Sequence, residues 1–227
     1  MSKYISAFII SAMCLISVAI ASDTEQIHFL ALDIPQDSDE YIVKNSQAEI
    51  HRLIADKAPE YSDKIIYHTP DNIHISLIRF NEIPPTLLKK YIELFKQDAN
   101  QLPNKNIADK LRLAKLHVTN TGFIVYEFPE PVSLTKFVNL LIKDLKKNNL
   151  YYKDSDFQEG GRIYPHFSVA YFNPKDVSVE KMRKILDGKV PAPECNSFVI
   201  NGFCLKHSEK LTKPLTYSTV YTFGNGL

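Results

Sequence analysis

Apolar residues recur along this chain in two alternating patterns. Short apolar runs, typical of strands, alternate with longer segments in which apolar residues return every three or four positions, as on one face of a helix. Strands are expected at residues 27–34, 63–68, 72–80, 111–119, 122–128, 164–172, 197–206 and 215–223. Helices are expected at residues 40–57, 86–101, 133–149 and 178–186. Each half of the chain therefore holds strands and a long helix, which predicts an α+β fold of two lobes with largely antiparallel sheets.

The N-terminal segment has a different pattern. Lys3 is followed by an uncharged, mostly apolar run over residues 4–22, which contains Ala19-Ile20-Ala21 close to its end. A basic start, an apolar middle and a small-x-small exit are typical of a cleaved secretory signal peptide. We therefore expect a signal peptide at residues 1–21, a single two-lobed domain at residues 22–227, and a secreted or periplasmic protein without stable membrane association. The alternative is an uncleaved membrane anchor, because the run approaches the roughly 20 residues that span a bilayer.

Composition narrows the classes of partner. The 227 residues include 27 Lys and Arg against 26 Asp and Glu, so no overall positive field gathers polyanions. A nucleic acid would have to be held by a local basic surface or as a short, deeply held substrate. No CxxC or HExxH spacing is present, so neither a metal nor another cofactor is expected. Cys195 and Cys204 are expected to be free thiols, and the chain is expected to be a monomer.

Two H-x-S motifs carry the candidate chemistry. His74 and Ser76 are two residues apart on an expected strand, and so are His166 and Ser168. Because side chains alternate along a strand, each pair lies on one face. One histidine can accept a proton from an attacking hydroxyl while the other protonates a leaving oxygen, and the serine hydroxyls can donate to phosphate oxygens. The four side chains are therefore the predicted catalytic set of a metal-independent phosphoesterase.

A single H-x-S or H-x-T match is a weak signal, because serine and threonine are common. The chain holds a third copy, His117-Val118-Thr119, which runs directly into the turn 120–122. The two motifs above differ from it, because each follows a proline-bearing loop and leads into a long apolar strand. We therefore interpret His117 as structural.

The layout resembles the 2H phosphoesterases, a superfamily named for two H-x-[S/T] motifs, one in each lobe. Residues 29–35 are similar to the opening strand of that superfamily, residues 72–77 to its first motif and residues 165–171 to its second. The resemblance implies two pseudo-symmetric lobes, with antiparallel sheets flanking a central cleft and helices on the outside. It also implies that both motifs lie on the cleft floor and act without a metal.

Two branches of that superfamily are similar to this chain. The serines of both motifs, residues 166–171, and residues 118–125 and 150–154 resemble the U6 small nuclear RNA phosphodiesterases, which trim RNA 3′ ends. The strand at residues 29–35 is closer to the 2′,5′-RNA ligase and cyclic phosphodiesterase branch. The chain departs from the first branch in three ways. It lacks an arginine near Gly122-Phe123, it carries what looks like an insertion at residues 155–164, and it begins with the expected signal peptide.

The resemblance implies an RNA phosphodiesterase that acts on 3′ ends as an exonuclease and leaves a 2′,3′-cyclic phosphate. The alternatives are a 2′,3′-cyclic nucleotide phosphodiesterase or 2′,5′-RNA ligase-like enzyme, and a nucleotide-binding module without turnover. Tyr164 and Tyr171 are the predicted base-stacking residues, although a core position is the alternative for Tyr171. Arg79, three residues past Ser76, is expected on the opposite strand face.

Overall fold

The computed structural model describes residues 27–33, 36–99, 116–127, 132–155, 165–190, 202–208 and 216–224. The expected signal peptide, Tyr164 and Cys195 lie outside these residues, as does nearly all of the expected insertion. Within the described residues, no helix has the length and apolar character needed to cross a membrane.

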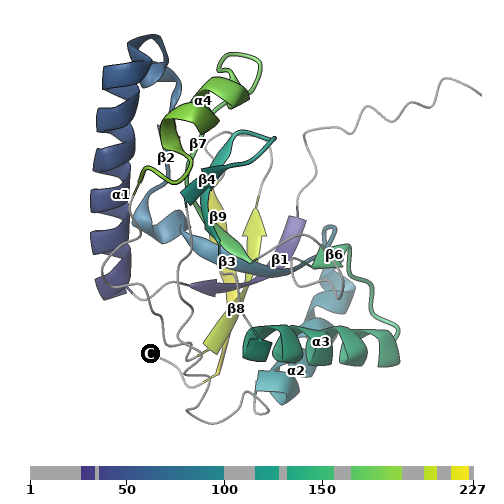
Figure 1. The fold of residues 1–227 in the computed structure, drawn as a ribbon. Coiled ribbons are helices and arrows are strands. Elements are labelled where there is room, and N and C mark those ends of the chain that lie inside the picture. The colour runs from purple at the N-terminus through teal and green to yellow at the C-terminus, as the bar shows by residue number, and fades with distance from the viewer. Residues whose placement is uncertain are drawn as a thin grey trace, which may run out of the picture.

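The first lobe is built on a five-stranded antiparallel sheet, here called sheet A. Its strands, in spatial order, are β6 (Asp154–Ser155), β3 (His74–Arg79), β1 (Ile27–Asp33), β8 (Gly202–Ser208) and β9 (Tyr217–Gly224). Helices α2 (Pro85–Ala99) and α3 (Val132–Lys147) lie side by side against one face of this sheet (Figure 1). Aromatic rings join these layers, because Phe95 of α2 and Phe137 of α3 both contact Phe203 of β8.

The second lobe is built on a four-stranded antiparallel sheet, here called sheet B. Its strands, in spatial order, are β2 (Ile66–Tyr67), β7 (His166–Tyr171), β5 (Phe123–Glu127) and β4 (Leu116–Val118). Helix α1 (Gln36–Lys57) packs against this sheet, and the Ser46 hydroxyl lies 2.8 Å from the hydroxyl of buried Tyr126. The short helix α4 (Val179–Leu186) contacts both α1 and β4, so helices lie on the outer side of this lobe too (Figure 1).

In each lobe, a helix that packs on the sheet follows a strand of the other lobe in sequence. Helix α1 follows β1 of sheet A but packs against sheet B, whereas α3 follows β5 of sheet B but packs against sheet A. One continuous cluster of buried residues consequently includes Leu30 of β1, Ile54 of α1, Leu141 of α3 and Phe167 of β7. The expected α+β architecture of two antiparallel lobes is confirmed.

Local sequence explains how the helices form. In α3, Leu134, Val138, Leu141 and Leu145 recur at three- and four-residue spacing, and all four are fully buried. Helix α4 begins after Ser178, whose hydroxyl accepts a hydrogen bond from the Lys181 amide at 3.3 Å.

Glycine is required in the turn between β4 and β5. Gly122 has φ of +86°, and a Cβ there would stand 2.1 Å from the Phe172 carbonyl oxygen. Its own carbonyl accepts a hydrogen bond from the Phe172 amide at 2.9 Å. The close approach joins this turn to the end of β7.

Two details of the expected element order are wrong. Residues 63–64 were expected in a strand, but they end a 3₁₀ helix, Pro59–Lys64, and only Ile66–Tyr67 pair as β2. Proline in the first turn and a bond from the Tyr61 amide to the Ala58 carbonyl favour the 3₁₀ helix there. The strand β6 was not expected, because only two residues pair and their sequence has no strand pattern.

Candidate active site

The two H-x-S motifs lie on strands that meet at the centre of the molecule. His74 and Ser76 are half-buried in β3 and alternate with fully buried Ile75 and Leu77, as expected from period two. His166 and Ser168 occupy the same positions in β7. Strands β3 and β7 belong to different sheets and contact each other. The fold therefore brings together the two strands that carry the predicted catalytic residues.

Each motif strand carries a β-bulge directly after its serine. In sheet A, Ser76 lies opposite Ala31, but the next pair is Ile78 with Leu30, so Leu77 is the extra residue. In sheet B, Ser168 lies opposite Val125, and the next pair is Ala170 with Ile124. Each lobe therefore has a β-bulge at the same position, directly after the serine of its motif. Bulges commonly redirect side chains beside active sites.

The bulge corrects the expectation for Arg79. Without it, Arg79 would lie on the face opposite Ser76, as expected from strict alternation. The extra residue restores the alternation, and Arg79 lies opposite Phe29. Phe29, Ala31 and Asp33 alternate along β1, so their partners Arg79, Ser76 and His74 share one sheet face. We call the face with His74 and Ser76, and the corresponding face with His166 and Ser168, the motif face of each sheet.

A carboxylate lies opposite each motif histidine. Asp33 pairs with His74 across β1 and β3, and Glu127 pairs with His166 across β5 and β7. The Asp33 carboxylate also forms an ion pair with Lys206, at 2.5 Å from its Nζ. Lys206 is only 4% exposed, so its charge is held within the protein rather than in solvent.

Glu127 contacts the third histidine. Its Oε1 lies 3.3 Å from Nε2 of His117, and His117 lies opposite Val125, which in turn lies opposite Ser168. His117 is thus on the motif face of sheet B, one strand beyond the H-x-S strand. This contact is in keeping with a supporting position, and the structural interpretation of His117 stays a prediction.

The His74 ring is oriented by its neighbours. Its Nδ1 lies 2.9 Å from the Asn72 carbonyl oxygen, which can only accept, so Nδ1 carries the proton of the neutral ring and Nε2 is left as an acceptor. The rings of Phe29 and Tyr217 flank it at centroid distances of 4.8 and 4.7 Å. Burial, and after it the positive charge of Lys206, lower the pKa of His74 to about 3. The histidine is therefore neutral at physiological pH.

Tyr217, at the start of β9, completes the motif face of sheet A. Its ring packs edge-on against both His74 and Phe29. Burial raises the pKa of Tyr217 to about 12, and the charge of Arg79 partly opposes that rise. The hydroxyl consequently stays protonated and can donate a hydrogen bond. The sequence pattern points to neither Tyr217 nor Lys206; the available signal for Lys206 is a lysine directly after the apolar run Phe203-Cys204-Leu205.

Tyr171 and Cys204, which the sequence analysis also considers, are both buried. Tyr171 lies on the motif face of sheet B, is 7% exposed, and packs against Phe123 with ring centroids 4.9 Å apart. Cys204 is a free thiol, buried beside Phe29 and Ala31, and burial raises its pKa. Across the described ranges, no group of three or more His, Cys, Asp or Glu side chains is placed to hold a metal ion.

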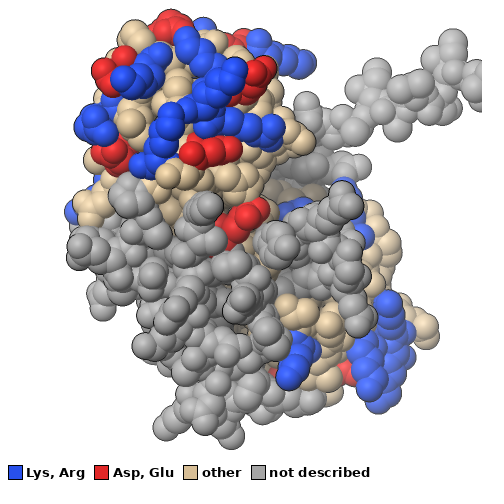
Figure 2. Space-filling view, in the orientation of Figure 1, with Lys and Arg blue, Asp and Glu red and all other residues tan. Residues whose placement is uncertain are grey.

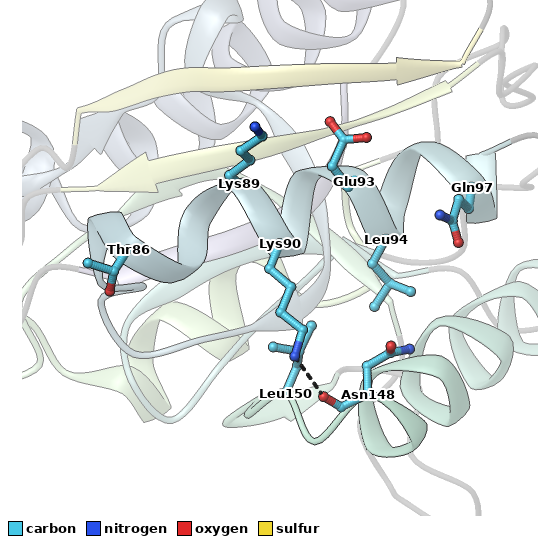
Figure 3. Close-up of a pocket in the computed structure, with 8 residues that line it drawn as sticks. All are labelled: Thr86, Lys89, Lys90, Glu93, Leu94, Gln97, Asn148 and Leu150. Carbon is cyan, nitrogen blue, oxygen red and sulfur yellow. Dashed lines mark hydrogen bonds between the residues drawn. The ribbon is translucent and has the colours of Figure 1, made fainter.

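Two surface hollows lie outside the motifs. One of about 460 Å³ lies between α2 and the loop after α3, where Lys90 donates to the Asn148 carbonyl at 3.2 Å (Figure 3). Its lining consists of Thr86, Lys89, Lys90, Glu93, Leu94, Gln97, Asn148 and Leu150. The other, of about 440 Å³, borders Tyr171 together with Asp63, Lys64, Ile66, Asn173 and Asp176. Neither lining includes a motif histidine or serine.

Charged side chains of both signs intermingle over α1 and α4 (Figure 2). Arg52 pairs with Glu49 on α1, and Lys184 pairs with Glu180 on α4. Because each of these exposed pairs joins a positive and a negative charge, this surface offers no field of a single sign to a long polyanion. Lys206 and Arg79 are two cations on the motif face of sheet A.

Comparison with known proteins shows the fold. No family model and no curated protein sequence matches the chain. Among solved structures, Escherichia coli LigT in complex with 3′-AMP superposes with a TM-score of 0.58 at 16% identity, covering 89% of this chain and 99% of LigT. A phosphoesterase gives 0.56 at 15% identity, covering 89% and 99% of the two chains. Kluyveromyces marxianus Usb1 with uridine monophosphate gives 0.52 at 10% identity, covering 87% and 99%. The chain therefore has the two-lobed fold of these phosphoesterases over nearly its whole length.

Proposed function

We propose that this chain is a metal-independent phosphodiesterase of the 2H type that acts on RNA 3′ ends. The observation that carries the proposal is the repeated construction of the two lobes. Each lobe presents a histidine and a serine on one strand, followed by the same bulge, and the two strands contact each other. Such a repeat supplies two proton-transfer groups and two hydroxyl donors to one phosphate.

His74 is the proposed general base. Its Nδ1 proton is held by the Asn72 carbonyl, so the lone pair on Nε2 is available. The ring is neutral before substrate arrives, and the negative charge of a bound phosphate would raise its pKa again. His74 then takes the proton of a ribose 2′-hydroxyl as that oxygen attacks the adjacent phosphorus.

His166 is the proposed general acid. As the bond from the attacking 2′-oxygen to phosphorus forms, the bond to the 5′-oxygen of the last nucleotide breaks, and His166 protonates that oxygen. The products are a 2′,3′-cyclic phosphate on the shortened RNA and a released nucleoside. Glu127 lies directly opposite His166 across the β5–β7 ladder.

The hydroxyls and Lys206 stabilise the negative charge that develops on the oxygens of the reacting phosphate. Ser76 and Ser168 donate to its non-bridging oxygens. Lys206, held inside the protein beside Asp33, contributes a fixed positive charge in a poorly solvated setting, where charges act strongly.

A second candidate is hydrolysis of 2′,3′-cyclic phosphates. In that reaction water replaces the 2′-hydroxyl as the nucleophile, and the same two histidines transfer the protons. The likeness to LigT, which binds 3′-AMP in the solved complex, favours this candidate. Both candidates share one site but differ in the attacking oxygen and in the leaving oxygen: in hydrolysis the bond from phosphorus to one ester oxygen of the ring breaks, and a histidine protonates that oxygen.

One assay separates the candidates. The purified chain is incubated in EDTA with an oligoribonucleotide, with the same oligonucleotide carrying a 2′-deoxy sugar at the penultimate position, and with a 2′,3′-cyclic nucleotide. Shortening of the first but not the second oligonucleotide is expected for attack by the 2′-hydroxyl. Ring opening alone would favour the second candidate, and binding without any turnover would identify a nucleotide-binding module. Activity that EDTA abolishes and a divalent ion restores would overturn the proton-transfer mechanism.

A further inference from the structure

The chain has another histidine beside the motifs, and its ring nitrogen is buried without a partner. His68 is 7% exposed, and no donor or acceptor among the described residues lies within hydrogen-bonding distance of its Nε2. An imidazole nitrogen in such a place destabilises the fold unless something else satisfies it. His68 follows β2 directly, and the sequence marks it only as the last residue of an expected strand.

The backbone of His68 is fixed beside the second motif. Its amide donates to the carbonyl of Val169, the residue after Ser168, at 3.0 Å. The side-chain amide of Gln47 donates to the carbonyls of both His68 and Val169, at 2.7 and 2.9 Å. These bonds extend the β2–β7 ladder by one residue and do not involve the imidazole.

The ladder also places His68 relative to the two motifs. Tyr67 lies opposite Ala170, and its ring faces His51 of α1 at 6.3 Å, so Tyr67 points to the helix-covered face of sheet B. His68 comes directly after Tyr67, and its backbone neighbour across the ladder is Val169, the extra residue of the β7 bulge. His68 is also close enough to His74 for its charge to contribute to the lowered pKa of His74. His68 is therefore next to both motifs, with its backbone bonded to the residue after Ser168 and its ring close to His74.

We propose that His68 is a third histidine of this site, which binds substrate by donating its Nε2–H to an oxygen of the nucleotide phosphate. This inference rests on the proposed function, because it assigns His68 to the same phosphate that His74 and His166 act upon. A bound phosphate oxygen would satisfy the buried nitrogen, and a neutral imidazole can donate one hydrogen bond without adding a charge.

The protonation state fits a binding role better than a third proton-transfer role. Burial lowers the pKa of His68 to about 4, so the ring is neutral across the range in which an RNA phosphodiesterase works. A hydrogen bond to a charged acceptor is about twice as strong as one between neutral groups. Loss of this bond should therefore weaken phosphate binding clearly, even while both proton-transfer groups remain.

The test compares three variants of the full chain. His68→Phe keeps an aromatic ring at this buried position but removes both nitrogens, and His68→Gln returns an N–H donor at a similar reach. His51→Phe is the matched control, because His51 is exposed on the opposite side of sheet B. The readouts are the Kd for inorganic phosphate and for 3′-AMP by calorimetry, the thermal midpoint, and kcat and KM on the oligoribonucleotide and cyclic nucleotide.

We expect His68→Phe to weaken both ligands by roughly tenfold to a hundredfold, the worth of one hydrogen bond to a charged group. Its thermal midpoint should stay the same or rise, because an unpartnered polar atom has been removed from a buried position. His68→Gln should recover part of the affinity, and His51→Phe should bind as the wild type does. A structural role would instead lower the thermal midpoint and leave Kd unchanged.

The outcomes for the inference and for the proposed function are distinct. Unchanged Kd values in His68→Phe overturn the inference, even if the wild type is an active phosphodiesterase. Conversely, a wild type that turns over neither RNA nor cyclic nucleotides overturns the proposed function. If phosphate binding by that inactive protein still depends on His68, the assignment of His68 as a phosphate-binding residue stands.

Discussion

Glu127 lies directly opposite His166 across the β5–β7 ladder, and in the other lobe Asp33 holds the same position relative to His74. The two carboxylates have different partners. Asp33 pairs with a buried lysine, Lys206, whereas Glu127 contacts a histidine, His117. The lobes therefore repeat in geometry but differ in charge. A permanent cation beside His74 favours its neutral form, which is why we assign the base to the first lobe and the acid to the second.

The first prediction concerns the two motif histidines. His74→Ala and His166→Ala each remove one half of the proton transfer, and the remaining histidine cannot perform both steps. Each variant should lose about 10²–10⁴-fold in kcat, as is typical of general acid–base catalysis. Because the two groups act as a unit, the double variant should be little worse than either single one. Single-turnover rates on the preferred substrate measure this directly.

His117→Ala is the internal comparison for that prediction. His117 lies on the motif face but reaches Glu127 rather than a motif residue, so its loss should cost less than about tenfold in kcat. Circular dichroism must confirm that the variant is folded. A folded His117→Ala protein as inactive as His166→Ala would show that the motifs have been paired wrongly.

The second prediction concerns the serine hydroxyls. Both serines are half-buried on β-strands, so Ser76→Ala and Ser168→Ala should leave the fold intact. If each hydroxyl stabilises developing charge, each variant should lose on the order of 10²–10³-fold in kcat. Near-normal rates in both variants would mean that the H-x-S spacing is coincidental here.

The positions of these four residues follow from the sequence because they depend only on local alternation. His74 and Ser76, or His166 and Ser168, share a face in any strand. The bulges after the serines do not follow from the sequence, because Leu77 and Val169 are apolar in either register and the shift depends on the partner strand. Strict alternation consequently placed Arg79 on the wrong face.

The neighbours of the motifs depend on strand order, which the sequence leaves open. Lys206 approaches His74 only because β8 pairs with β1, and Tyr217 only because β9 pairs with β8. His68 is buried because the end of β2 meets β7. Such contacts between distant segments leave no periodic pattern, so a sequence search for motifs finds the proposed acid–base pair but misses the residues that surround it.

The third prediction concerns Arg79. The bulge places its side chain on the motif face near Tyr217, where a guanidinium can bind a phosphate or a neighbouring backbone phosphate of RNA. Arg79→Met should raise KM by roughly tenfold and change kcat little, the pattern expected when binding is lost equally in substrate and transition state. Arg52→Met is the control, because Arg52 is exposed on α1 and pairs with Glu49. Equal KM values in the two variants would show that Arg79 does not bind the substrate.

The fourth prediction uses the charge of Lys206. The acid limb of the kcat/KM profile reports the base of the free enzyme, so it should lie below the ordinary histidine pKa of about 6.5. Lys206→Met keeps the aliphatic stem but removes the charge that lowers the pKa of His74. The acid limb should then move to higher pH. Lys181→Met, at an exposed ion pair with Glu60, should leave the profile unchanged. An unmoved acid limb in Lys206→Met would show that Lys206 does not set the protonation of His74.

The fifth prediction concerns stability and lies away from the site. Asp98 of α2 is 1% exposed, and burial, followed by a hydrogen bond to Asp144 of α3, raises its pKa to about 7. In the unfolded chain the same carboxyl ionises near its ordinary value of 3.8. Between about pH 4 and pH 7 the folded state therefore holds a proton that the unfolded state has released. The contribution of Asp98 to stability must fall as pH rises through this window and stay constant above it.

Asp98→Asn tests this, because the amide remains neutral and can still donate a hydrogen bond to Asp144. At pH 4 the variant and the wild type should have similar free energies of unfolding, and by pH 7 the variant should be the more stable. The histidines His28, His68 and His74 have lowered pKa values, so they make stability rise with pH over the acidic range. That rise is common to both proteins and cancels in their difference. Urea unfolding at each pH unit from 4 to 8 measures the difference, with Asp63→Asn on the exposed 3₁₀ helix as the control. Parallel curves for Asp98→Asn and the wild type would show that Asp98 ionises normally in the folded protein.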